Sequence, residues 1–234
     1  MTGVPRLAVN EASSITTRVA AILPRNISGK KAILDMKEAD VRGWRDLEYF
    51  GFWFENIFKT RLLADLGMRA GPQHGHTRFD IAGAFVWDLK VHGMGSKQVI
   101  LNDREAMEAC LKNGPLGFII VHGDYTKDDA DRSFKLWHDR EKGKPTAYVL
   151  EGVATGRNSR PRKTAFDPVR VQALVLPSAD TVKEGMRRGW MTTFQEGMRN
   201  AGGSLRRQKY KISSLERVPA EFIVAKADVP RSPG

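Results

Sequence analysis

Residues 78–92 read Arg-Phe-Asp-Ile-Ala-Gly-Ala-Phe-Val-Trp-Asp-Leu-Lys-Val-His, and this stretch decides the fold that the sequence predicts. Apolar side chains occupy the odd positions on both sides of Gly83-Ala84, and most ionisable side chains occupy the even positions. Successive side chains of a strand point to opposite faces. The pattern therefore predicts two strands, over 77–81 and 85–92, with one apolar face and one ionisable face. A short loop joins the two strands into a β-hairpin.

The register of this hairpin would bring two carboxylates together. If residues 83–85 form a three-residue loop, Asp80 lies opposite Asp88, with Lys90 two residues further along the same face. Directly opposed residues have Cβ atoms about 4.5–5.5 Å apart, and two like charges at that distance destabilise a hairpin. A divalent cation would compensate them, because Mg²⁺ binds one or two carboxylates together with water and phosphate. The lysine would orient a water and neutralise charge that develops on the phosphate.

Asp80, seven intervening residues and then Asp88-Leu89-Lys90 resemble the signature of the PD-(D/E)XK nucleases, a superfamily that includes many restriction endonucleases. The resemblance covers residues 40–125 and departs from the motif at its proline, where this chain has Phe79. The gap between the two aspartates is also near the short end of the family's range. Asp35-Met36-Lys37 has the same tripeptide pattern, but it lacks the apolar alternation, the partner aspartate and a preceding helix.

The resemblance implies a restriction-endonuclease-like core and a Mg²⁺-dependent endonuclease that cuts double-stranded DNA, leaving 5′-phosphate and 3′-hydroxyl ends. Asp80 and Asp88 would hold the metal ion, and Lys90 would position the attacking water. In this family the helix before the hairpin often supplies a further metal-binding glutamate. Glu55 is preferred for that role because the small Gly51 precedes it, but Glu48, seven residues earlier on nearly the same helix face, is a rival.

The implied activity also implies partners. A Type II restriction enzyme that cuts both strands of a symmetric site would be a two-fold homodimer. A companion DNA methyltransferase acting on the same site would accompany it. Two alternatives stay open: a repair, recombination or junction-resolving nuclease of the same fold, and a basic DNA-binding protein without catalysis.

The positive charge is concentrated in the second half of the 234-residue chain. Residues 155–211 carry 13 Lys and Arg against four acids, which is +9 of the net +11. Such a surface suits a polyanion, because contacts with phosphates release condensed counterions. The expected DNA-binding residues lie in two basic segments: Arg157, Asn158, Arg160, Arg162 and Lys163, then Arg206, Arg207 and Lys209.

Periodicity elsewhere predicts an α/β or α+β fold, a central mixed sheet flanked by helices. Helices are expected over 38–66, 103–113 and 179–200, with Asn102 as the cap of the second, and buried strands over 116–122 and 169–176. We expect an N-terminal extension at 1–36, a single nuclease domain at 37–227 with its catalytic core near 40–125 and its DNA-binding part near 155–211, and a disordered tail at 228–234.

Other chemistries have weaker support. The single cysteine, Cys110, excludes a disulfide framework and a cysteine-rich zinc site, and its apolar helical neighbours predict a buried position. Five histidines include the pair His74 and His76, but no third ligand stands at zinc spacing. The chain has no apolar run of membrane-spanning length and no signal-peptide pattern. We therefore expect no membrane association and a cytoplasmic location.

Overall fold

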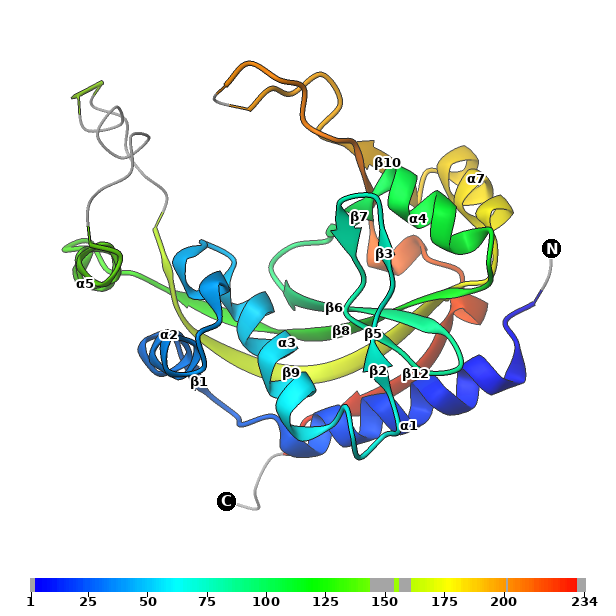
Figure 1. The fold of residues 1–234 in the computed structure, drawn as a ribbon, viewed down its shortest axis with the longest axis horizontal. Coiled ribbons are helices and arrows are strands. Elements are labelled where there is room, and N and C mark those ends of the chain that lie inside the picture. Colours follow the sequence, from blue (N-terminus) through cyan, green and yellow to red (C-terminus); the bar gives the residue numbers. More distant parts are fainter. Residues whose placement is uncertain (1–2, 144–153, 156–160, 201, 231–234) are drawn as a thin grey trace.

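The computed structural model describes residues 3–143, 154–155, 161–200 and 202–230, and it folds around one strongly curled mixed sheet (Figure 1). The strand order is β1-β9-β8-β6-β5-β2, with β12 also paired to β9. These strands are β1 (Ile27–Ser28), β2 (Arg69–Ala70), β5 (Ile81–Ala82), β6 (Val86–Gly93), β8 (Leu116–Lys127), β9 (Lys163–Leu176) and β12 (Ile223–Asp228). The expected mixed sheet flanked by helices is confirmed.

The centre of the sheet consists of β6, β8 and β9. β6 and β8 are parallel, with Asp88 opposite Phe118 and His92 opposite His122. β8 and β9 are antiparallel and pair along almost their whole length. The apolar run that predicted a strand over 116–122 thus forms the buried middle of the fold, as a strand with sheet neighbours on both sides requires.

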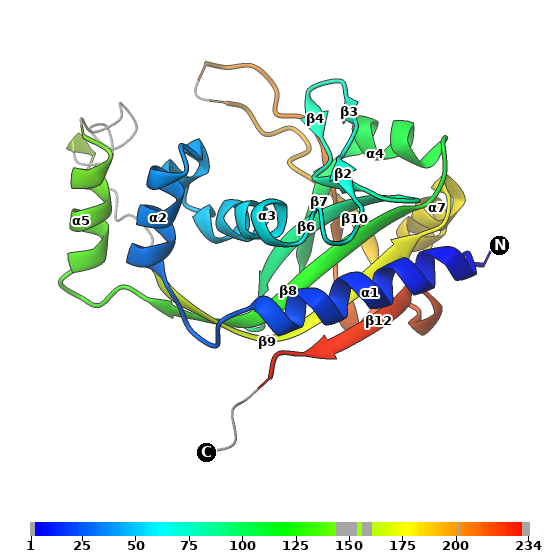
Figure 2. The same ribbon diagram turned by 60° about the horizontal axis from the view of Figure 1, so that its bottom comes forward.

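One face of the sheet is covered by α1 (Arg6–Ile22), α2 (Gly29–Glu38) and α3 (Tyr49–Arg61) (Figure 2). Trp87 and Leu89 of β6 point to this face and share a hydrophobic cluster with Ile15 and Val19 of α1 and with the aromatic side chains of α3. The first 36 residues, expected as an extension, therefore contribute to the same core as the central strands.

A second hydrophobic cluster lies on the opposite face. Here a three-stranded sheet, in the order β10-β11-β7, packs with two helices against Phe118, Ile120 and Leu174. Its elements are β7 (Val99–Asp103), α4 (Arg104–Leu111), α7 (Ala179–Arg188), β10 (Met191–Phe194) and β11 (Lys209–Ile212). The small sheet matters for the site, because it carries β7 and β11 toward the ionisable side of β6.

Two expected helices are shorter than their patterns. The helix expected over 179–200 ends at Arg188, because Gly189 takes the left-handed conformation (φ 75°) that closes helices, and β10 follows. In the pattern over 38–66, Asp40 has a positive φ and Asp46 is extended. Only a short 3₁₀ turn (Arg42–Arg45) and α3 are therefore helical there.

The remaining elements are a two-stranded sheet of β3 (Gln73–His74) and β4 (Thr77–Arg78), the helix α5 (Ser133–Glu141), and short 3₁₀ turns at Leu215–Arg217 and Ala220–Phe222. The beginning of the expected tail is paired: Asp228 ends β12 and Val229 donates a backbone hydrogen bond to Val169. In the part of the chain that the structure describes, no helix combines the length and apolarity that crossing a membrane requires.

Candidate active site

The expected hairpin is formed, and its register agrees with the prediction. Ile81 pairs with Trp87 and Ala82 with Val86, so the loop contains Gly83, Ala84 and Phe85. Asp88 and Lys90 lie on the same face of β6, opposite to the face that buries Trp87 and Leu89. The alternation of the sequence has therefore placed an ionisable pair on one side of a strand whose other side is core.

The first expected strand departs from the prediction before it reaches Asp80. Thr77 and Arg78 pair with β3 in the separate two-stranded sheet, and Phe79 and Asp80 belong to no strand. The backbone turn sends Phe79 into the second hydrophobic cluster, whereas Ile81 lies in the first. The two residues were expected to share a face, and that expectation is wrong because the strand changes partners between them.

Because Asp80 is not paired in the sheet, its side chain bonds to β6 in place of a backbone group. Its Oδ2 accepts a hydrogen bond of 2.7 Å from the backbone N–H of Leu89, on the edge of β6 beyond the last β5 pair. Burial, together with the charges of Asp88 and Glu55, raises the pKa of the Asp80 carboxyl to about 8. The Leu89 N–H and the Lys90 ammonium oppose it only in part.

Asp88, Lys90 and Asn102 form a closed ring of polar contacts. The Lys90 ammonium pairs with Oδ2 of Asp88 and donates a hydrogen bond of 3.0 Å to Oδ1 of Asn102. Asn102 in turn donates through Nδ2 to Oδ1 of Asp88 at 2.7 Å. The Asp88 side chain is 3% exposed and that of Lys90 is 21% exposed, so the lysine forms the solvent side of the ring.

The ring fixes the protonation state of Lys90. Burial by itself would lower the pKa of this amine, but Asp88 and Asp80 outweigh that effect, and the pKa lies above its ordinary value. Lys90 is therefore an ammonium ion at neutral pH. It can donate hydrogen bonds to a water or a phosphate oxygen, but it cannot accept a proton.

Asn102 is the residue of the ring that the sequence did not single out for the site. Its pattern position predicted the cap of the following helix, but the cap is Asp103, whose Oδ1 accepts from the backbone N–H of Ala106. β7 pairs with β11 and not with β6, so its approach to Asp88 depends on how the small sheet packs on the large one. No spacing within the sequence indicates that contact.

The helix glutamate lies nearby but is not joined to the other carboxylates. Glu55 of α3 raises the pKa of both Asp80 and Lys90 through its charge, while its own carboxylate pairs with Lys59 one turn further along. Glu48 precedes α3 and pairs with Lys163 instead. Of the two rivals, Glu55 is thus the one that acts electrostatically on the site.

A hard divalent cation fits Asp80 and Asp88. Two close carboxylates, one with a raised pKa, form a site in which bound positive charge would be stabilising, and Mg²⁺ completes such a site with waters and phosphate. Within the described ranges, however, no three His, Cys, Asp or Glu side chains come together as a metal-binding group. Glu55 would have to leave Lys59 to serve as a third ligand.

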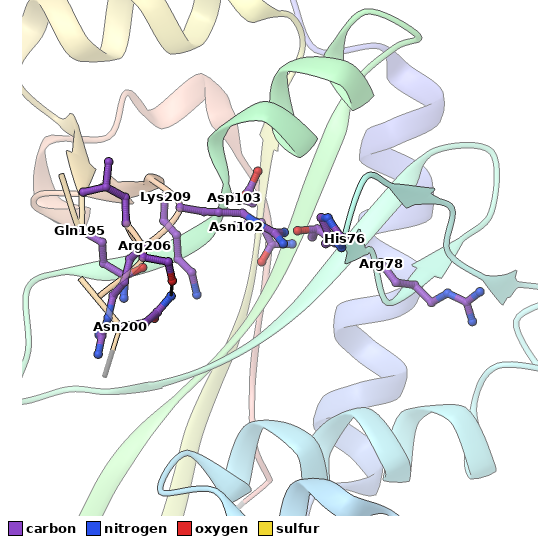
Figure 3. Close-up of a pocket in the computed structure, with 12 residues that line it drawn as sticks. His76, Arg78, Asn102, Asp103, Gln195, Asn200, Arg206 and Lys209 are labelled. Atoms are coloured by element: carbon purple, nitrogen blue, oxygen red, sulfur yellow. Dashed lines mark hydrogen bonds between the residues drawn. The ribbon is translucent and has the colours of Figure 1, made fainter. Parts of the chain in front are cut away.

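A cavity of about 680 Å³ adjoins this site and shares Asn102 with it (Figure 3). Arg206, Arg207 and Lys209, three of the expected DNA-binding residues, line it. His76, Thr77 and Arg78 line it from the β3–β4 side, and Asn102 and Asp103 lie between the two groups. His76, one of the two histidines that lack a third ligand at zinc spacing, is part of the cavity wall.

The other expected DNA-binding residues are not brought to the cavity. Arg162 is 11% exposed and pairs with Asp139, while Lys163 pairs with Glu48 and lies over the Tyr125 ring. Both cations are thus held by contacts within the chain. Arg157, Asn158 and Arg160 lie outside the described residues.

Cys110 and the histidines His92 and His122 are buried. Cys110 is buried in the second hydrophobic cluster, as its helix pattern predicted. His92 and His122 face each other across β6 and β8, with 3.1 Å between their Nδ1 atoms, and both side chains are buried. Burial lowers the pKa of each imidazole, so this pair is neutral at pH 7.

Comparison of this chain with models of protein families, with curated proteins and with solved structures found no match.

Proposed function

We propose that this protein is a Mg²⁺-dependent endonuclease that cuts double-stranded DNA in the manner of Type II restriction enzymes. The observation that supports this proposal best is the ring of Asp88, Lys90 and Asn102 beside the carboxylate of Asp80. Two carboxyl groups that suit Mg²⁺ and an ammonium ion that suits a phosphate are groups that can promote the hydrolysis of a phosphodiester.

In this proposal each residue has a separate task. Asp80 and Asp88 hold Mg²⁺, which would polarise the phosphodiester and lower the pKa of a bound water. Lys90 remains protonated, so it orients the attacking water and stabilises negative charge on the phosphate. The attacking water loses a proton to the solvent as its oxygen forms a bond to phosphorus. The bond from phosphorus to the 3′ oxygen breaks, and the 3′ oxygen takes a proton from a second water. Asn102 positions Lys90 and Asp88 relative to each other.

The proposal extends to the assembly. Cleavage of both strands at a symmetric sequence requires two copies of the site, and a two-fold homodimer supplies them with matching symmetry. A companion methyltransferase that modifies the same sequence would protect the host DNA, as restriction enzymes require.

The direct test is cleavage of unmethylated phage DNA by the purified protein in Mg²⁺, beside a chelator control. We expect discrete fragments with 5′-phosphate ends from the wild type and none with chelator, Asp88→Asn or Lys90→Ala. Asn102→Ala should retain activity reduced about 10–100-fold, which is the usual effect of losing a positioning partner of a metal site.

The chain offers matched controls for these variants. Lys37 belongs to the other Asp-x-Lys tripeptide, where it pairs with Glu141 on the protein surface, so Lys37→Ala should cut like the wild type. Asn113 is exposed and bonds only to the helix backbone among the described contacts, so Asn113→Ala should also be unaffected. If the wild type binds the DNA in Mg²⁺ but leaves it intact, the protein is a DNA-binding protein without catalytic activity. Preference for branched or damaged DNA over linear duplex would favour a repair or junction-resolving nuclease.

A further inference from the structure

The cavity beside the site is built from three separate parts of the chain. The segment between β10 and β11 supplies Gln195, Asn200, Ser204, Leu205, Arg206 and Arg207, and β11 adds Lys209. The β3–β4 turn supplies a second wall and the end of β7 supplies the residues between them. In Figure 3, Arg206, Asn200 and Gln195 lie together on one side, and Asn102 lies between them and His76.

The cavity is cationic. Four of its lining side chains are Arg or Lys, and the single acid among them, Asp103, is 8% exposed and caps α4. Lys209 is close enough to Lys90 for the two charges to interact: burial lowers the pKa of the Lys209 amine, and Lys90 lowers it further. Lys209 therefore brings the positive charge of the cavity wall close to Lys90.

The lining is also poor in apolar surface. Among the described residues that line it, Leu205 is the only aliphatic hydrophobic one, and none is Phe, Tyr or Trp. Unpaired bases usually stack on aromatic rings, and the described lining offers none. Arginine, lysine, amide and hydroxyl groups contact phosphate and sugar oxygens, and in a duplex groove arginine and amide groups also read base edges.

We propose that this cavity binds the sugar–phosphate backbone of the DNA strand that enters the Asp88–Lys90 site. The proposal rests on the proposed nuclease function for its substrate and adds a subsite to it. Asn102 joins the two places, because it lines the cavity and hydrogen-bonds with both Asp88 and Lys90. If Arg206, Arg207 and Lys209 bind one backbone phosphate, a neighbouring phosphodiester would be positioned beside Asp88 and Lys90.

Binding measured in EDTA tests this proposal without cleavage. The affinity for a fluorescent mixed-sequence duplex is followed by anisotropy from low to physiological salt, for the wild type and for Arg206→Ala/Arg207→Ala. Both side chains belong to exposed residues, so the variant should fold like the wild type. Each lost phosphate contact lowers the slope of log affinity against log salt by about 0.9. We therefore expect the slope to decrease by about 2.

A charge-matched control distinguishes local contacts from net charge. Arg6→Ala/Arg18→Ala removes the same charge from exposed positions of α1, which covers the opposite face of the central sheet, and should leave the slope unchanged. Equal slopes for wild type and Arg206→Ala/Arg207→Ala would overturn the proposal. Equal decreases in both double variants would overturn it too.

A second probe separates backbone from base. A strand of abasic tetrahydrofuran residues offers phosphates without bases, and Arg206→Ala/Arg207→Ala should weaken its binding by the same factor as that of the duplex. A loss confined to the duplex would mean that the cavity reads bases, contrary to the proposal. The experiments distinguish failure of the proposed subsite from failure of the proposed nuclease function. A decreased slope without cleavage in Mg²⁺ supports the subsite alone, and cleavage with an unchanged slope supports the nuclease alone.

Discussion

The two aspartates of the candidate site, Asp80 and Asp88, lie in different surroundings. Asp80 and Asp88 are both aspartates of one hairpin, but Asp80 has left the strand and accepts a backbone hydrogen bond. Asp88 is held by Lys90 and Asn102. The raised pKa of Asp80 follows from burial beside two further carboxylates. The site is therefore short of positive charge when no cation other than Lys90 is near.

The raised pKa makes a prediction about pH and metal binding. Without metal, the folded protein retains the Asp80 proton up to about pH 8, whereas the unfolded chain loses it near pH 4, so this carboxyl makes stability decrease as pH rises between those values. Mg²⁺ must displace that proton to bind. The rise in melting temperature on adding Mg²⁺ should therefore increase from pH 6 to pH 8.5.

The measurement is thermal unfolding in Mg²⁺ and in EDTA across this pH range. Asp80→Asn has no carboxyl to titrate, so its smaller response to Mg²⁺ should be less dependent on pH. A wild-type response that is the same at pH 6 and pH 8.5 would contradict the assignment of Asp80 as a metal ligand.

At the scale of elements, helix α1 stabilises the hairpin through hydrogen bonds. Glu11 of α1 accepts hydrogen bonds from the backbone N–H groups of Ala84 and Phe85 and from Nε1 of Trp87. The helix therefore fixes both the loop and the first buried residue of β6. Residues assigned to an extension by the sequence thus position the strand that carries Asp88 and Lys90.

Removing this contact should destabilise the protein. Glu11→Ala leaves the indole N–H of Trp87 without its acceptor in a ring that is fully buried, and an unsatisfied buried donor costs about 1–3 kcal/mol. Urea unfolding should show a loss of that size in the free energy of unfolding. Glu38→Ala, at the exposed end of α2, serves as the control and should change little. Equal midpoints for the two variants would mean that Glu11 does not stabilise the hairpin.

At the scale of the molecule, buried imidazoles make the fold sensitive to acid. Burial, together with the charges of His92, Arg170 and Lys226, lowers the pKa of His122 to about 4. His138, which bonds to the carbonyl of Trp44, also has a pKa lowered to about 4 by its burial. In the unfolded chain both would titrate near pH 6.5.

Because the unfolded state binds more protons between these values, stability should decrease as pH falls from about 6.5 to about 4. Chemical unfolding at pH 7, 6, 5 and 4 measures the effect, and His122→Gln should show a shallower decrease than the wild type. Parallel profiles for the two proteins would show that His122 is not buried in its neutral form.

The sequence by itself determined the central elements and one half of the site. Alternation and a short loop are local properties, and hydrogen bonds between adjacent strands transmit them directly, so the register that pairs Ile81 with Trp87 and Ala82 with Val86 followed from residues 78–92. Likewise, the apolar run at 116–122 could only be a buried strand or a buried helix, and its length favoured the strand.

Only the tertiary structure decided which side chains from distant parts of the chain contact that hairpin. The change of strand partners at Phe79 depends on the two-stranded sheet of β3 and β4. The ring contact of Asn102 and the approach of Lys209 to Lys90 depend on the three-stranded sheet packed across the large one. Their partners are separated along the chain and come from strands that do not pair with β6. Close packing of side chains fixes such contacts, and packing between distant segments has no period that a sequence displays.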